Sequence, residues 1–430
     1  MPILIENIAI IPMSGADSYI ENGYLIIRDD HIEQLGAGPA PPGSYDKIIN
    51  GRDQVLLPGL INTHTHAAMT LLRGYADDLP LMEWLSTKIW PLEAKLNGDD
   101  IYWGTMLAIV EMIKSGTTTF NDMYFFMSRA AEAVEASGMR AVLSRGMIGV
   151  SPDSQLALED SRQLVGQWHG AAGDRIRFAL GPHAPYTCPP DYLKQVVALA
   201  EELQVGLHIH IAETRQEVED IINQYGVSPV QLMLESGVFS RPTLAAHCVH
   251  LSADDIAILK QYKVGVAHNP ESNMKLASGI APVPTLLKAG INVGLGTDGA
   301  SSNNNLDMIQ EMRSCALLHK VGSMDPTVIP AYQALEMGTI QGARALGWGD
   351  RIGMLKAGYK ADMIIMNLTE ANMIPRYDIL ANIIYSAQAA DVDTVIINGK
   401  IVMENRHMTL IDEREVLDRC KAIGRDLVSR

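Results

Sequence analysis

The sequence predicts an α/β fold, a (β/α)8 TIM barrel joined to a small β-sandwich domain built from both chain ends. Three observations lead to this prediction. The middle of the chain alternates short apolar runs with amphipathic helical stretches, which is typical of strand–helix repeats on a parallel sheet. Both ends are instead rich in short β-branched runs. A chain of 430 residues, 47% of them hydrophobic, is long enough to bury both cores.

The N-terminal segment is predicted to form strands separated by turns. Residues 5–11 and 24–28 are rich in β-branched and aromatic side chains. Residues 14–17 and 21–23 contain the glycine, asparagine and aspartate that are typical of turns.

The barrel is predicted to occupy residues 58–361. Its eight expected strands are residues 57–62, 117–121, 141–145, 176–180, 206–211, 243–247, 264–267 and 291–296. Their apolar character indicates burial on both faces, as in parallel sheets. An open doubly wound sheet is the alternative. It would need a glycine-rich phosphate loop after the first strand, where this chain has only Pro58-Gly59.

Helices are predicted between these strands. Residues 100–114 are apolar at helical spacing and stop before a glycine, and residues 191–203 follow two prolines, which favour a helix start. Ser252 and Asp255 have the spacing of a capping box. Residues 333–346 are expected to form the last helix of the series.

The far end of the chain resembles its beginning. Residues 392–397 and 400–404 are β-branched runs that flank Asn398-Gly399, which is the strongest short-range signal for a hairpin. Because chain termini often lie close together, we expect residues 1–57 and 362–430 to form one domain that includes a C-terminal helix.

Charge and composition exclude several classes of function. The formal net charge is −16, so a nucleic acid is not an expected partner, because phosphate binding needs a basic surface. The chain has no apolar run of about 18 residues and no basic start followed by an apolar block, so neither a membrane span nor a signal peptide is expected. The four cysteines form no Cys-x-x-Cys pair. These features predict a cytoplasmic protein.

In a barrel, reacting groups gather at the C-terminal ends of the strands. The first predicted strand is followed by His64 and His66, which share one face of an extended chain about 6–7 Å apart. Two imidazoles on one face can bind one metal ion. Two structural histidines are the alternative, but the position at the end of a first barrel strand favours the metal.

The fifth predicted strand carries His208 and His210 and leads to Glu213. His210 is nearer the rim, so we expect it to be the third metal ligand, with His208 buried behind it. Glu213 is expected to meet a substrate. The alternative is that Glu213 only stabilises the start of the following helix through its negative charge.

The sixth and eighth strands end at His247 and Asp298. A carboxylate at the end of an apolar strand is costly to bury unless it is paired or metal-bound. Three histidines and one aspartate suit zinc, with nickel, manganese or iron as alternatives. A metal would activate a water molecule, and His247 and Asp298 are candidates to accept its proton.

These residues, in this order, resemble the amidohydrolase superfamily, and the resemblance covers nearly the whole chain. Its opening signature is the Pro-Gly-Leu-Ile-Asn-Thr-His-Thr-His of residues 58–66. The binuclear branch uses a lysine at the end of the fourth strand, and residues 175–183 lack one. The resemblance therefore implies the deaminase branch, with one divalent ion, Zn²⁺ first of all. Its implied ligands are His64, His66, His210 and Asp298.

Three further residues are similar to substrate contacts of deaminases that act on adenosine-type nucleosides. The resemblance implies that Glu93 binds the ribose hydroxyls, that Arg145 contacts the substrate and that His183 contacts the purine. The alternatives are that Glu93 is a solvated charge on a helix, that Arg145 forms an ion pair at the barrel rim, and that His183 is an ordinary loop histidine. Some relatives have a second arginine at about the position of Ala157. Without it, contact with the amino-acid carboxylate of a substrate depends on Arg145 in this chain.

The implied reaction is hydrolytic deamination of 5′-methylthioadenosine, S-adenosylhomocysteine or adenosine. Glu213 would protonate ring nitrogen N1, while His247 and Asp298 handle the proton of the attacking water. Glu213 and Asp298 would thus also contact the substrate. The alternatives are a guanine deaminase or an aminotriazine hydrolase on the same metal site, and a non-catalytic scaffold, which the filled ligand positions disfavour. Self-association is a further expectation.

Overall fold

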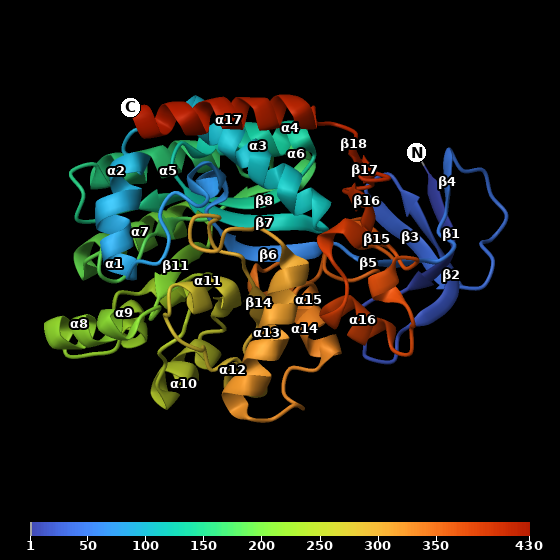
Figure 1. Cartoon of the computed structure of the whole chain (residues 1–430). Helices are drawn as coiled ribbons and strands as arrows, with labels where there is room; N and C mark the ends of the chain where they lie inside the picture. The colour runs from blue at the N-terminus through green and yellow to red at the C-terminus, as the bar shows by residue number, and fades with distance from the viewer. Residues whose placement is uncertain (1) are drawn as a thin grey trace.

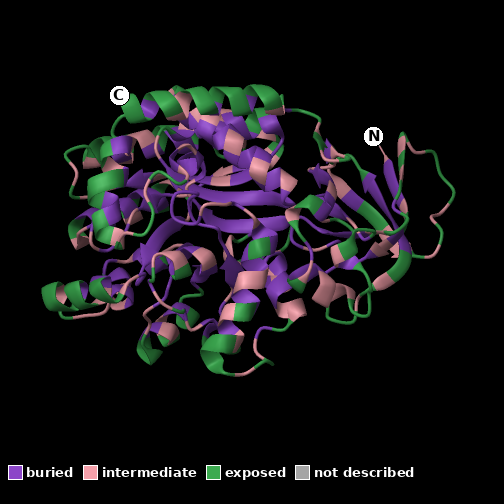
Figure 2. Cartoon of the chain, viewed as in Figure 1, coloured by how far each residue is buried: buried purple, intermediate pink, exposed green. Residues whose placement is uncertain are grey.

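The computed structural model describes residues 2–430 and contains a barrel and a sheet that lie side by side (Figure 1). The barrel strands are β6 (Leu60–Thr65), β7 (Thr117–Tyr124), β8 (Arg140–Met147), β9 (Ile176–Phe178) with β10 (Gly181–Pro182), β11 (Leu207–Ile211), β12 (Thr243–His247), β13 (Gly265–His268) and β14 (Val293–Leu295). The predicted barrel is therefore confirmed, with its fourth strand interrupted. Every residue of β6 and β7 is buried, as Figure 2 shows for the centre of the barrel.

Two seams close the barrel. Strands β6 to β10 form one hydrogen-bonded sheet and β11 to β14 form another. At one seam the His208 amide donates to the Leu180 carbonyl at 2.9 Å, and at the other the Asp298 amide donates to the His64 carbonyl at 2.9 Å. The second seam places the ends of the first and last strands next to each other.

Helices cover the outside of the barrel. They include α3 (Gly98–Lys114), α4 (Met127–Ser137), α5 (Ser154–Trp168), α7 (Pro190–Leu203), α8 (Arg215–Tyr225), α10 (Ala253–Gln261), α11 (Pro270–Lys275), α13 (Met308–Ser323), α14 (Ala331–Met337) and α15 (Ile340–Ala345). The capping box of Ser252 and Asp255 is present. Over the mouth of the barrel, the chain between β6 and α3 forms the short turns α1 (Leu81–Trp84), η2 (Leu85–Ile89) and α2 (Trp90–Glu93).

The expected single helix over residues 333–346 is wrong, because α14 and α15 are separate. The break lies at Gly338 and Thr339, where the Thr339 backbone leaves the helical region at φ −132° and ψ −102°. A Cβ atom at Gly338 would lie 2.7 Å from the Met312 sulfur. Close packing against α13 therefore overrides a helical hydrophobic pattern.

Both chain ends contribute to one nine-stranded sheet. Its strands are β1 (Ile3–Ile10), β2 (Ile20–Arg28), β3 (His31–Ala37), β4 (Lys47–Asn50), β5 (Gln54–Pro58), β15 (Met363–Asn367), β16 (Val392–Ile397), β17 (Lys400–Glu404) and β18 (His407–Met408). The two ends meet where β5 pairs antiparallel with β15. The hairpin at Asn398 and Gly399 is confirmed, with positive φ angles of 52° and 75°.

Two local expectations about the N-terminal region are wrong. Leu57 belongs to β5 of the sheet, and the barrel strand β6 begins only at Leu60. The chain crosses between the two units at Gly59, where a Cβ atom would lie 2.1 Å from the Thr118 hydroxyl. The turn expected at residues 21–23 lies inside β2. Its glycine, Gly23, allows a close approach to the neighbouring strand β3.

The C-terminal helix α17 (Glu413–Ser429) begins near β18 and runs along α3 of the barrel, away from the sheet (Figure 1). Lys114 of α3 pairs with Glu413, and Arg430 pairs with Asp100.

The domain boundaries at residues 57 and 362 stay a prediction. Across residues 2–430, the structure contains no helix whose length and apolar character would let it span a membrane.

The barrel and the sheet are joined by a buried ion pair. Arg140 at the start of β8 donates to both carboxylate oxygens of Asp362, at 2.6 and 3.1 Å, and to Asn398 at 3.0 Å. Their side chains are only 3% and 2% exposed.

We predict that Asp362→Asn destabilises the protein by about 3–5 kcal/mol, because it leaves a buried guanidinium without its counter-charge. Glu413→Gln removes the partner of the half-exposed Lys114 and should cost less than about 1 kcal/mol. Denaturant unfolding of both variants compares these costs. Equal costs would show that the Arg140–Asp362 pair does not hold the two units together.

Candidate active site

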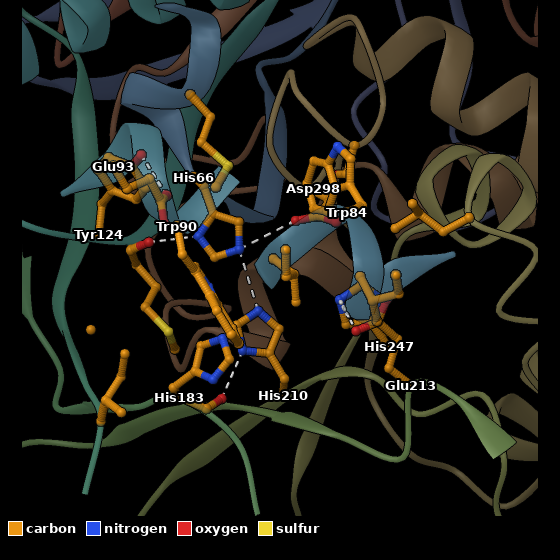
Figure 3. Close-up of a pocket in the computed structure, with 18 of the residues that line it drawn as sticks. His66, Trp84, Trp90, Glu93, Tyr124, His183, His210, Glu213, His247 and Asp298 are labelled. Carbon is orange, nitrogen blue, oxygen red and sulfur yellow. Dashed lines mark hydrogen bonds and ion pairs between the residues drawn. The ribbon is translucent and has the colours of Figure 1, made fainter. Parts of the chain in front are cut away.

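A pocket opens at the C-terminal ends of the barrel strands. Figure 3 shows the side chains that line it, among them His66, Trp84, Trp90, Glu93, Tyr124, His183, His210, Glu213, His247 and Asp298. The pocket is narrow, with a cavity volume of about 80 Å³.

Side chains from the first, fifth and eighth strands converge at the bottom of this pocket. The Asp298 Oδ1 atom lies 3.4 Å from His64 Nε2 and 3.3 Å from His66 Nε2. His210 Nε2 lies 3.3 Å from His66 Nε2. The structure therefore brings together the four residues that the sequence predicted as metal ligands.

The protonation of two of these imidazoles follows from their partners. His66 Nδ1 lies 2.6 Å from the Met123 carbonyl, and His210 Nδ1 lies 2.7 Å from the His183 carbonyl. A carbonyl oxygen only accepts, so each Nδ1 carries the hydrogen. With these hydrogens on Nδ1, the Nε2 atoms of the two rings, 3.3 Å apart, are turned toward each other. A cation between them could be bound by both nitrogens.

The orientation of His64 follows from His208, which lies behind it. His208 Nε2 lies 2.8 Å from His64 Nδ1, and His208 Nδ1 lies 3.2 Å from the Asn121 side-chain nitrogen and 3.3 Å from the Ser144 hydroxyl. Binding of a metal through His64 Nε2 requires the hydrogen of the His64–His208 pair to be on His64 Nδ1. His64 Nε2 is left buried with no hydrogen-bond partner. Burial lowers the pKa of His64 to about 4, so its ring is neutral.

These atoms fit a divalent metal ion. The candidate ligand atoms of His64, His66 and His210 lie within 4.8 Å of one another, as do those of His64, His247 and Asp298. Imidazole nitrogens oriented by carbonyl acceptors, together with a carboxylate oxygen, are typical of zinc-type centres.

Asp298 is held as a carboxylate. Its Oδ2 atom accepts hydrogen bonds from the Ser272 and Ser302 hydroxyls at 2.7 and 2.8 Å. Burial by itself raises the pKa of Asp298, but its contacts with His64, His66 and His247 outweigh burial and hold that pKa well below its usual value. The carboxylate thus presents Oδ1 to the histidines in charged form.

Glu213 and His247 form a second pair of proton-carrying groups. Glu213 Oε2 lies 3.9 Å from His247 Nε2, and His247 Nδ1 lies 2.9 Å from the Asn273 side-chain oxygen. Burial raises the pKa of Glu213. Burial lowers the pKa of His247, but the Glu213 and Asp298 carboxylates outweigh that effect and raise it. Both shifts favour the protonated form of the side chain.

The loop that carries Glu213 is fixed by Glu217. The Glu217 carboxylate accepts the Ala212 amide at 2.9 Å and the Glu213 amide at 2.8 Å. Ala212 has a positive φ of 54°, a conformation that costs about 1–3 kcal/mol. The start of α8 thus holds the turn that aims Glu213 into the pocket.

Glu93 lies across the pocket from Glu213 (Figure 3). The Tyr124 hydroxyl donates to Glu93 Oε1 at 2.7 Å. Burial raises the pKa of Glu93. His183 also lines this pocket, and burial lowers its pKa to about 4, so its ring is neutral.

Arg145 lies outside this pocket. It lines an adjoining cavity, where its Nε donates to Asp160 at 3.2 Å. Of the other predicted site residues, only Glu93 also lines this cavity.

Several functional positions were missed from the sequence. They are Tyr124, Glu217, Ser272, Asn273 and Ser302. Each contacts a predicted site residue through a short hydrogen bond. Tyr124, Ser272, Asn273 and Ser302 lie at or just after the ends of β7, β13 and β14, so a search of the strand ends for hydroxyl and amide side chains could have found them.

Comparison with known proteins gives a consistent result. The model of the amidohydrolase family matches residues 55–402. A protein of Syntrophomonas wolfei named 5-methylthioadenosine/S-adenosylhomocysteine deaminase is 68% identical over 431 residues, covering 100% of both chains. A protein of Desulforudis audaxviator with the same name is 55% identical and covers 100% of this chain and 99% of that one.

Among solved structures, an adenosine deaminase from Xanthomonas campestris with bound zinc superposes with a TM-score of 0.95 at 34% identity, covering 100% and 99% of the two chains. A zinc-containing atrazine chlorohydrolase from Arthrobacter aurescens has a TM-score of 0.92 at 24% identity, covering 98% and 100%. The second likeness shows the fold alone.

We predict that His210→Ala loses most of its bound metal, because an Nε2 ligand disappears. His208→Gln should keep most of it, since a glutamine oxygen can still accept from His64 Nδ1, with affinity reduced by at most about 10–100-fold. Metal analysis of the purified variants measures both. Full occupancy in His210→Ala, with loss in His208→Gln, would make His208 the third ligand.

Proposed function

Because the chain belongs to the amidohydrolase family, we propose that it deaminates 5′-methylthioadenosine and S-adenosylhomocysteine, and also adenosine, by hydrolysis. The products are the inosine analogues and ammonia. One observation carries the proposal: a single pocket has a metal-suited cluster beside Glu213 at one end and Glu93 at the other. The names of the relatives at 68% and 55% identity support it.

The proposed metal is one Zn²⁺ ion, held by His64, His66, His210 and Asp298. When bound, it lowers the pKa of a water molecule toward 7 and so supplies a nucleophile near neutral pH. Two observations support this assignment: His66 Nδ1 and His210 Nδ1 face backbone carbonyls, which leaves their Nε2 atoms for a metal, and the similar adenosine deaminase structure contains zinc.

Glu213, His247 and Asp298 move the protons of the reaction. Glu213, whose pKa is raised by burial, donates a proton to ring nitrogen N1 and makes C6 electron-poor. The water that attacks C6 gives its proton to Asp298 or His247. Asp298 returns that proton to the amino group, which leaves as ammonia, and the remaining proton on the C6 oxygen passes to Glu213 as the C6 carbonyl forms. The buried, low-dielectric site strengthens each of these charge interactions.

The remaining residues orient the nucleoside. The Glu93 carboxylate accepts hydrogen bonds from the ribose hydroxyls, and the Tyr124 hydroxyl holds it in place. His183 contacts the purine from the wall of the pocket. Trp84 and Trp90 supply apolar walls. Arg145 lies in the adjoining cavity, on the side of the 5′ substituent.

Rival substrates use the same metal ligands. Guanine and aminotriazines lack a ribose, so they would leave the buried Glu93 carboxyl without a substrate partner. That residue therefore favours a nucleoside.

A cytoplasmic location, the absence of a nucleic-acid partner and self-association stay predictions.

We predict that Glu213→Gln lowers kcat by about 10²–10⁴-fold, because glutamine cannot supply an acidic proton. Metal content should be unchanged. Glu219→Gln, at an exposed position of the following helix α8, is the matched control and should be fully active. Steady-state ammonia release measures both variants. Turnover near that of the unmodified protein in Glu213→Gln would remove Glu213 as the acid.

We predict ammonia release from 5′-methylthioadenosine, S-adenosylhomocysteine and adenosine, and none from guanine or an aminotriazine. Glu93→Gln should lower kcat/KM for the nucleosides by roughly 10²-fold, because a charge-assisted hydrogen bond to each ribose hydroxyl is lost. A coupled ammonia assay with all five compounds tests this. Release only from guanine or the triazine would overturn the substrate assignment and keep the metal site.

A further inference from the structure

The active-site pocket continues into a second cavity. The two share part of their wall, namely Trp90, Glu93, Phe125, Gly146 and Ile148. If Glu93 holds the ribose and C6 lies at the metal ligands, the 5′ substituent extends past Glu93 into this second cavity. The inference below therefore rests on the proposed function. It concerns which 5′ substituents the cavity accepts.

The positive charges in the second cavity are already paired. Arg145 donates through Nε to Asp160 at 3.2 Å and also to the Gly146 carbonyl. Arg129 donates to Asp99 at 2.8 Å and pairs with Glu132. Each guanidinium therefore already faces a carboxylate, which offsets the positive charge that it offers to a substrate carboxylate.

The rest of the lining adds negative charge. Asp153 and Asp160 line the cavity together with Glu93, against the two arginines. Ala157 lies one helical turn before Asp160 on α5 and also lines the cavity. Because residues i and i+3 share a helix face, Ala157 supplies a methyl group at a position where a basic side chain would have offset Asp160.

The two proposed substrates differ in what they bring to this cavity. The methylthio group of 5′-methylthioadenosine is small and apolar, and the shared wall offers it the apolar surfaces of Trp90, Phe125 and Ile148. S-adenosylhomocysteine brings a carboxylate and an ammonium. Its carboxylate would have to compete with Asp160 for one guanidinium, and a carboxylate that loses water without gaining a partner is strongly disfavoured.

We propose that Asp160 is a specificity-determining residue: by neutralising Arg145 it makes the chain prefer 5′-methylthioadenosine to S-adenosylhomocysteine. Asp160 acts through Arg145 and does not touch the reacting atoms. Its side chain is 39% exposed, against 18% for Arg145, so it can be replaced without disturbing the core.

The test is the ratio of kcat/KM for S-adenosylhomocysteine to kcat/KM for 5′-methylthioadenosine. We expect Asp160→Asn to raise this ratio at least about fivefold, because the freed guanidinium can form a charge-assisted pair with the carboxylate. The gain should appear as a lower KM for S-adenosylhomocysteine rather than a higher kcat, since the contact is the same in the ground and transition states.

Two controls separate this role from a general effect of charge or structure. Glu159→Gln removes a negative charge one residue earlier on α5, where the side chain faces Arg162 and Gln163, and should leave the ratio unchanged. Arg145→Ala combined with Asp160→Asn should abolish the gain, because the freed guanidinium is then absent.

Each outcome has a distinct meaning. An unchanged ratio in Asp160→Asn would overturn the proposal, and so would a gain that survives in the double variant. A lower ratio would also overturn it, by showing that Asp160 binds the substrate ammonium. The proposed function fails separately, if the metal-loaded protein releases ammonia from neither compound.

Discussion

The repulsion among lone pairs at the mouth of the barrel is the constraint on which the site depends. His66 Nδ1 and His210 Nδ1 each face a backbone carbonyl, and His64 Nδ1 faces His208 Nε2. When each ring carries its hydrogen on Nδ1, the three Nε2 lone pairs and the charged Asp298 face one another with no hydrogen among them. A bound cation removes the repulsion, which is why the same hydrogen bonds that orient the rings also select a metal ion.

The barrel supplies the positions that this arrangement requires. The seam between β6 and β14 joins His64 to Asp298 through a backbone hydrogen bond. His247, the last residue of β12, and Asp298, in the loop that follows β14, both adopt positive φ angles, 70° and 58°. Such conformations cost about 1–3 kcal/mol each, and the surrounding packing holds them. The strain turns the side chains toward the pocket rather than along the strand.

The two ends of the pocket divide the chemistry. The histidine end holds the groups that carry protons and fit a metal ion, while the Glu93 end and the adjoining cavity hold the rest of a nucleoside. Arg145 lies in that cavity already paired with Asp160. The ion-pair partners of Arg145 therefore matter more for substrate binding than its position does. An arginine that is already paired with a carboxylate offers little positive charge to a substrate.

The barrel, the hairpin at Asn398 and Gly399, and the convergence of His64, His66, His210 and Asp298 could be predicted from the sequence, because they follow from hydrophobic periodicity and from the shared end of parallel strands. The tertiary structure decided what depends on contacts between distant segments. It split the helix at Gly338, which packs against Met312. It placed His208 behind His64 and closed Arg145 onto Asp160. Hydrogen-bond partners and close packing are properties of neighbours in space, and sequence spacing fixes only neighbours along one element.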